Sequence, residues 1–114
     1  MTNQDDSFPA EIGSGNIFAD LGLADAEENR LKAEVVMVLQ RLIKARDLTQ
    51  TAAAGLLGVS QPDLSHVLRG RFRGWSLERL MRMLVVFDQD IEIAVRPHAR
   101  TGQAGRITVT AQRS

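Results

Sequence analysis

The spacing of apolar positions predicts a long helix in the first half of the chain. Between residues 25 and 46, apolar side chains recur three or four positions apart, which gives one stripe on a helix of about five turns. Asp25 and Glu28 match an N-cap with its capping-box partner, and Lys44 and Arg46 fall in the last turn, where cations are favoured. The stripe consists of Leu31, Val35, Val38, Leu39, Leu42 and Ile43.

Two short helices separated by a tight turn are predicted next. Thr49 can cap a helix over residues 50–57, and Gly58 follows where a left-handed residue can end a helix. Ser60 can then cap a second helix, which tolerates Pro62 because the N–H groups of a first turn have no partner within the helix. The inner face and the end of this second helix would be formed by Leu64, Val67, Leu68 and Gly70.

A further helix can begin after Ser76, and beyond it the period of the pattern changes. The apolar face of that helix consists of Leu77, Leu80, Met81 and Leu84. Residues 91–95 (IEIAV) and 107–111 (ITVTA) instead alternate apolar and other positions, which is typical of half-buried strands. These two strands could form a hairpin, or they could pair across a dimer.

The N-terminal part of the chain shows no helical period. Residues 1–16 are polar, and we expect a mobile arm there. A short apolar patch follows, expected as a turn against the core: Ile17, Phe18, Leu21 and Leu23. The predicted organisation is therefore an arm over 1–16, a helical domain over 17–88, and C-terminal strands and a tail over 89–114.

Composition excludes several classes of protein. A length of 114 residues, 44% of them hydrophobic and 25% charged, fits one globular domain with tails. The sequence has no cysteine, which rules out a disulfide framework and cysteine-based zinc or redox sites. It has no apolar run long enough for a membrane span, and its acidic N-terminus lacks the features of a signal peptide. We therefore expect a cytoplasmic protein.

The net charge of zero conceals an uneven distribution. Residues 1–30 carry a net charge of −6, whereas residues 31–114 carry +6. Such a basic region suits a polyanion such as nucleic acid, although a solvated charged surface has the same composition. Five arginines lie close together in the sequence: Arg69, Arg71, Arg73, Arg79 and Arg82.

The stretch from Leu48 to Gly70 meets the requirements of a helix-turn-helix. Two helices that cross steeply need a small residue at the contact, which Ala54 supplies, and the turn needs the permissive backbone of Gly58. Apolar residues on both sides of the turn would lock the helices together. The second helix then keeps one open polar side, an arrangement that places a helix in the DNA major groove. The polar residues of this helix are Gln61, Ser65, His66 and Arg69.

The sequence LTQTAAAGLLGVSQPDLSHVLRG resembles the helix-turn-helix of the XRE (Cro/repressor-type) DNA-binding family. A narrower resemblance, to its HigA-like antitoxin branch, lies in GSGNIFADLGL, in GVSQPDLSHVLRGRFRGWSLERL and in IEIAVRP. The resemblance implies a mainly α, lambda-repressor-like helix-turn-helix bundle of four to five helices, with a short C-terminal β-hairpin or dimer-forming strands. It also implies a homodimer that represses its own operon at a palindromic operator and neutralises a RelE/HigB-like toxin.

Other functions remain open. A stand-alone XRE-type transcriptional regulator would have the same DNA chemistry but no toxin partner. A protein-interaction module could keep the fold without DNA binding, although the arginine cluster argues against this. The acidic N-terminal segment could bind the basic surface of a toxin, or it could simply keep the protein soluble.

Candidate base contacts lie on the second helix of the motif. Gln61 opens this helix, and its amide can pair with adenine through two hydrogen bonds. Ser65 and His66 lie one turn further on and could contact a base edge or a phosphate. Asp63 is better explained as part of the helix cap. No metal site is predicted, because His66 has only the distant His98 as a companion.

Candidate contacts to the DNA backbone flank the same helix. Gln50 begins the preceding helix, whose N–H groups and side-chain amide can meet a phosphate. Ser60, at the cap of the second helix, is a further candidate. Arg69, Arg71 and Arg73 follow the second helix and are predicted to grip the backbone, unless that loop is only a solvated surface.

No catalytic or cofactor site is predicted. Ser60, Ser65 and His66 lack an orienting acid other than Asp63, which the cap already uses, and there is no phosphate-binding loop. We therefore expect a protein that is not an enzyme and needs no cofactor. The aromatic side chains after the second helix are expected to pack that loop against the core rather than to stack on bases: Phe72 and Trp75.

A single recognition helix binds DNA weakly, so we expect a homodimer that reads two half-sites about one helical turn (~34 Å) apart. Two elements could form its interface. The alternating residues Ile91–Val95 offer strand edges, and the helix over Leu80–Val86 could supply a helical contact instead.

Overall fold

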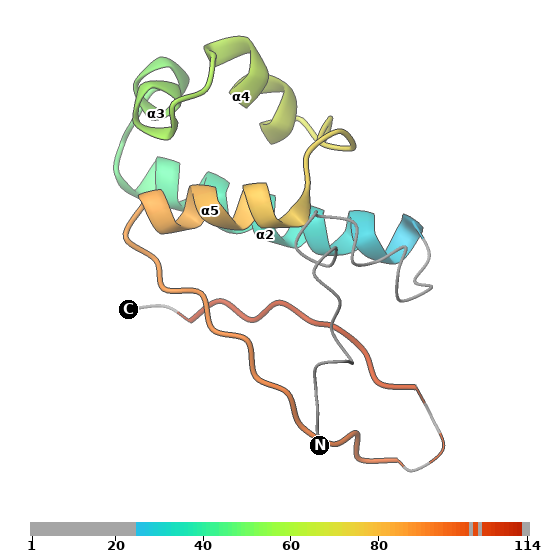
Figure 1. The fold of residues 1–114 in the computed structure, drawn as a ribbon. Helices are drawn as coiled ribbons and strands as arrows, with labels where there is room; N and C mark the ends of the chain where they lie inside the picture. The colour runs from blue at the N-terminus through green and yellow to red at the C-terminus, as the bar shows by residue number, and fades with distance from the viewer. Residues whose placement is uncertain (1–24, 101, 103, 113–114) are drawn as a thin grey trace.

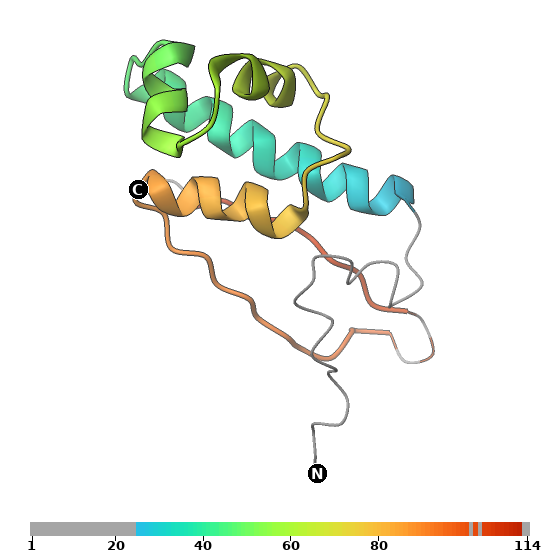
Figure 2. The same cartoon turned by 45° about the horizontal axis from the view of Figure 1, so that its top comes forward.

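Four helices form the folded part of the computed structural model, which describes residues 25–100, 102 and 104–112. They follow one another as α2 (Asp25–Ala45), α3 (Gln50–Leu57), α4 (Gln61–Leu68) and α5 (Leu77–Val86), as Figure 1 shows. α2 and α5 lie side by side in one layer, and α3 and α4 lie across that layer (Figure 1, Figure 2). The fold is thus mainly helical, as the sequence predicts.

The apolar stripe of α2 forms one wall of the core. Its buried members are Leu31, Val35, Val36, Leu39 and Ile43, while Val38 and Leu42 are partly buried against them. Asp25 is not at the predicted N-cap position, because α2 begins at Asp25 itself. Asp25 therefore belongs to the first turn, where an acidic side chain still faces the positive end of the helix dipole.

The rest of the core comes from the short helices and from the end of α5. The small residues Ala53 and Ala54 of α3 are buried, which lets α3 and α4 approach closely, as predicted for Ala54. The large side chains that are fully buried outside α2 are Leu64, Val67, Leu80 and Phe87. The predicted apolar patch at residues 17–23 lies outside the described residues.

The C-terminal segments do not form the hairpin that their alternating pattern suggests. Residues 89–98 and 105–112 are extended and run in opposite directions on the side of the α2–α5 layer away from α3 and α4 (Figure 1, Figure 2). Within the described ranges no residue is in a strand, and no backbone hydrogen bond links the two segments. The alternation creates two faces on each segment, but it does not specify the edge with which a segment pairs.

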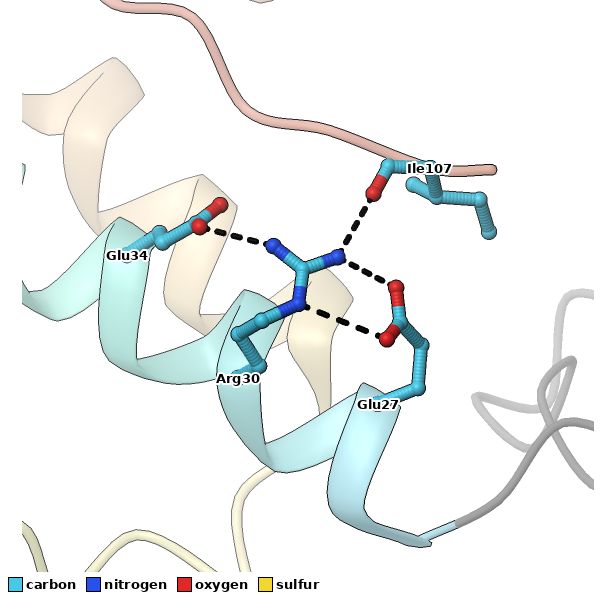
Figure 3. Close-up of polar contacts among 4 residues, drawn as sticks. All are labelled: Glu27, Arg30, Glu34 and Ile107. Atoms are coloured by element: carbon cyan, nitrogen blue, oxygen red, sulfur yellow. Dashed lines mark hydrogen bonds and ion pairs between the residues drawn. The ribbon is translucent and has the colours of Figure 1, made fainter. Parts of the chain in front are cut away.

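Arg30 fastens the second of these segments to α2. Its guanidinium is paired with Glu27 and Glu34 on the same helix, and Nη2 also donates to the carbonyl oxygen of Ile107 at 2.9 Å (Figure 3). The hydrogen bond to Glu27 raises the pKa of Arg30 and lowers the pKa of the Glu27 carboxyl. Val109 is partly buried against the core, so the segment is held to α2 at Ile107 and to the core at Val109.

Arg46 fastens the end of α5 in a similar way. Its Nη2 donates to the carbonyl oxygen of Phe87 at 3.1 Å and pairs with Asp88 at 2.9 Å, while the guanidinium lies over the Phe87 ring. Asp88 adopts a left-handed backbone with φ 65°, which turns the chain sharply after the helix. The direction in which residues 89–98 leave α5 is therefore set by contacts with the turn after α2.

Candidate nucleic-acid interface

A tight turn at Gly58 joins α3 to α4. Thr49 caps α3 by accepting the N–H of Ala52 at 3.0 Å, as its position predicts. Gly58 has φ 71°, and the N–H of Val59 returns to the carbonyl oxygen of Ala54 at 3.1 Å. A β-carbon at position 58 would meet no atom within 4 Å, so the backbone angle alone favours glycine here.

α4 presents one side to the core and the other to solvent. Ser60 caps the helix by accepting the N–H of Asp63 at 3.1 Å, and Leu64 and Val67 are completely buried. Ser60 is an exposed residue although its side chain caps the helix. The solvent side of α4 and its C-cap consists of Gln61, Pro62, Asp63, His66 and Arg69.

The two glutamines predicted to contact DNA are joined to each other. Nε2 of Gln61, the first residue of α4, donates to Oε1 of Gln50, the first residue of α3, at 3.0 Å. Both residues are exposed. The bond occupies one of the two amide hydrogens of Gln61 and leaves its second hydrogen and its Oε1 available. The same bond leaves the NH₂ group of Gln50 with both hydrogens available.

Ser65 does not lie with these residues. It is only 5% exposed, and its Oγ accepts a hydrogen bond from Nη2 of Arg69 at 2.8 Å. Because an α-helix turns by about 100° per residue, Ser65 lies about 60° around the helix from Leu68, at the margin of the buried side. His66 lies on the exposed side, as expected.

The loop after α4 exposes arginines on a backbone that is held at two points. Arg71 and Arg73 are exposed, whereas Phe72 between them is buried, which agrees with the packing role predicted for this aromatic side chain. Nζ of Lys32 in α2 donates to the carbonyl oxygen of Arg73 at 3.2 Å and lies 3.2 Å from a carboxylate oxygen of Glu28. Lys32 is itself buried, so a charged group inside the domain fixes the loop.

Sequence reasoning did not identify Lys32. Its signal is its place on the helix, because Lys32, Val36, Leu39 and Ile43 recur at the same spacing as the apolar stripe. A lysine in that series has to find an acceptor when it is buried. The partner is a carbonyl group 41 residues away, which local sequence does not indicate.

The remaining two arginines of the cluster are engaged on α5. The guanidinium carbon of Arg79 lies 3.7 Å from the centre of the Trp75 ring, and Trp75 packs against the core, as predicted. Arg82 pairs with Glu78 at 2.7 Å. The exposed arginines at the C-cap of α4 and in the loop that follows it are Arg69, Arg71 and Arg73.

Two short helices joined by a glycine turn, with the polar side of the second helix exposed, define a helix-turn-helix domain. The sequence matches the family described as "Helix-turn-helix domain" over residues 17–96. A solved structure named "Putative XRE Family Transcriptional Regulator" is 40% identical to this chain, with a TM-score of 0.73. The match covers 78% of this chain and 100% of that one. None of the curated proteins matches.

The chain therefore belongs to the XRE family of helix-turn-helix transcriptional regulators. This is a family of DNA-binding proteins rather than enzymes. Among the described residues, no helix is both long enough and apolar enough to cross a membrane.

Proposed function

We propose that the chain is a sequence-specific repressor that binds double-stranded DNA as a homodimer, with α4 in the major groove. The observation that carries the proposal is the Gln50–Gln61 amide pair at the exposed start of α4. The loop that follows the other end of α4 exposes Arg71 and Arg73 and is anchored to the domain core through Phe72 and Lys32. A palindromic operator would present one half-site to each copy.

The geometry of the amide pair favours adenine over guanine. Adenine offers one acceptor, N7, and one donor, the N6 amino group, to the major groove, whereas guanine offers two acceptors. Gln61 keeps one N–H and its Oε1 when the other N–H is bonded to Gln50. It can therefore satisfy both adenine groups but only one of the two guanine acceptors without breaking the bond to Gln50. The expected discrimination at this base pair is about 1–3 kcal/mol.

The neighbouring groups suit phosphates. Gln50 can donate its free amide hydrogens, and the Ser60 hydroxyl can donate its hydrogen while its oxygen caps α4. Arg71 and Arg73 are exposed and can contact the DNA backbone. We assign Ser65 the role of holding Arg69, because its hydroxyl is buried and already bonded to that guanidinium.

His66 completes the proposed surface. It lies on the solvent side of α4, more than one turn after Gln61, and could contact a base edge or a phosphate. Its two ring nitrogens allow it to donate or to accept.

The test measures, by fluorescence anisotropy, the affinity of the protein for its operator duplex and for a scrambled duplex. Gln61→Ala should lower the affinity for the operator but not for the scrambled duplex. Arg71→Ala should weaken binding to both and make the slope of log affinity against log salt shallower by about 0.9 for each phosphate that is no longer neutralised. Arg82→Ala is the matched control, because this arginine is paired with Glu78 on α5. Equal decreases in affinity on both duplexes for Gln61→Ala would remove its reading role.

We infer further that the protein is the antitoxin of a toxin–antitoxin pair that regulates its own operon. The support is the resemblance to HigA-like antitoxins and the acidity of residues 1–30, which suits the basic surface of a RelE/HigB-like, RNA-directed toxin. The test is co-purification with the product of a small basic reading frame beside this one. Capture that disappears when residues 1–24 are deleted supports the acidic segment as the toxin-binding element. If no such neighbour is captured by the full chain, the protein is a stand-alone XRE-type regulator.

A further inference from the structure

Residues 91–95 form an exposed apolar row that pairs with nothing in the described part of the chain. Ile91, Ile93 and Val95 are 39%, 82% and 92% exposed and point to one face of an extended segment, because side chains two residues apart share a face. No backbone hydrogen bond within the described ranges involves residues 90–100. An extended segment with an apolar face and open N–H and C=O groups is a template for another strand.

The other extended segment is not placed to fill this role. Ile107 is held to α2 by the bond from Arg30 to its carbonyl oxygen (Figure 3), and Val109 packs against the core. Figures 1 and 2 show the two segments as separate ribbons rather than as a paired ladder. Within the described part of the chain, residues 91–95 therefore have no strand partner.

The sequence of the segment is complementary to itself in one antiparallel register. When Ile93 faces Ile93 of a second copy, Ile91 faces Val95 on the same apolar side. On the other side, Asp90 faces Arg96, so each end of the pairing carries opposite charges. Pro97 comes directly afterwards and, having no N–H, is a natural end for the ladder.

The neighbouring registers are less favourable. Centring the pairing on Glu92 puts two like charges directly opposite each other, which is destabilising. Centring it on Ala94 also matches charges, because Glu92 then faces Arg96, but Ile91 is left opposite Pro97. A register centred between two residues places polar side chains opposite apolar ones on both faces.

We propose that residues 90–96 pair antiparallel with the same segment of a second copy of this chain, in the register centred on Ile93. This inference rests on the homodimer of the proposed function and names the surface that forms it. α5 offers less as an interface, because Leu80, Met83 and Leu84 are buried in the core of the chain. Only Val85 and Val86, at its C-terminal end, are exposed large hydrophobic residues.

Disulfide trapping without DNA tests the register directly, and the chain has no cysteine of its own. I93C alone should form a cross-linked dimer under mild oxidation, because facing α-carbons in a sheet lie about 4.5–5.5 Å apart, within disulfide reach. I91C alone and V95C alone should not cross-link, since their partners would be about 13 Å apart along the strand. A mixture of I91C and V95C should cross-link. Cross-linking of an I93C and V95C mixture in place of I93C alone would overturn the register.

Sedimentation of the full chain without DNA tests the interface. Ile93→Glu should raise the dimer dissociation constant by at least about 100-fold, because it replaces the two central isoleucines with like charges. Met37→Glu, a similar change at an exposed position of α2, should change it by less than about twofold. A wild-type protein that is monomeric at micromolar concentration refutes the inference, as does a dimer that Val85→Glu disrupts and Ile93→Glu does not.

Charge reversal provides the second readout. Arg96→Asp should weaken the dimer about tenfold at low salt, because it places two acids opposite each other at both ends. The double change Asp90→Arg with Arg96→Asp should restore the wild-type dissociation constant to within about twofold. Failure of the double variant to recover, in a protein that keeps its helical circular dichroism, contradicts the pairing. Both measurements omit DNA, so they can fail or succeed independently of operator binding.

Discussion

Alanine at Gly55 and alanine at Gly58 should change the stability of the protein in opposite directions. Both glycines have open space where a β-carbon would go, so steric contact contributes to neither change. Gly55 lies inside α3, where alanine is favoured by roughly 0.5–1 kcal/mol. Gly58 has φ 71°, a left-handed conformation that costs a residue with a β-carbon about 1–2 kcal/mol. Alanine also restricts the unfolded chain, which returns about 0.4–1 kcal/mol.

The net expectation is that Gly55→Ala stabilises by about 0.5–1 kcal/mol and Gly58→Ala destabilises by about 0.5–1.5 kcal/mol. Urea unfolding followed by circular dichroism at one protein concentration measures both, with the midpoints falling on opposite sides of the wild type. Gly58→Asn serves as a control, because asparagine tolerates the left-handed region and should cost less than alanine. If the urea midpoint shifts in the same direction for both alanine variants, the conclusion that the backbone angle alone favours glycine at position 58 is refuted.

Three further predictions concern the buried lysine and the Arg30 cluster. Lys32→Met should lower the free energy of unfolding in urea by about 1–3 kcal/mol, because the Arg73 carbonyl group is left without its donor. The same change should weaken DNA binding, although Lys32 itself does not contact DNA. Arg30→Leu should speed limited tryptic cleavage after Arg106, because Ile107 loses the bond that holds it to α2, while cleavage after Arg71 should stay unchanged. The lowered pKa of Glu27 adds stability above its ordinary value of 4.5, and this stability disappears as the pH falls below that value. The difference in urea midpoint between wild type and Glu27→Gln should therefore shrink on acidification through that range.

The elements that local sequence determines are predictable, including the four described helices and the N-caps of α3, α4 and α5. Thr49, Ser60 and Ser76 each accept the N–H three residues later, which depends only on the residue type at the start of a helix. The glycine turn and the small residue at the helix crossing are predictable for the same reason. The Gln50–Gln61 bond is not predicted, although placing both residues at the starts of adjacent helices makes their proximity a reasonable outcome.

The features that escape prediction depend on partners far away in the sequence or on the exact facing of a side chain. The sequence places Ser65 on the open side of α4, but a serine at the margin of the buried side can face either way until its hydrogen-bond partner is known. Arg69 supplies that donor. The alternating pattern over residues 91–95 correctly indicates an extended segment with an apolar face, but not its pairing edge. A period of two specifies faces, while a strand partner is a non-local choice.

The proposed pairing segment and the proposed DNA surface lie on opposite sides of the α2–α5 layer (Figure 1). Pairing of residues 90–96 would therefore leave α4 free, and the path from α4 through α5 would set the distance between the two recognition helices. Arg46 fixes the direction in which the chain leaves α5, through its bonds to Phe87 and Asp88. Arg46→Leu should consequently reduce the affinity penalty for adding two base pairs between half-sites, while binding to a single half-site stays unchanged. Anisotropy on the two spacings measures this penalty, and an equal penalty in the wild type and the variant would show that the exit of the segment does not control the spacing.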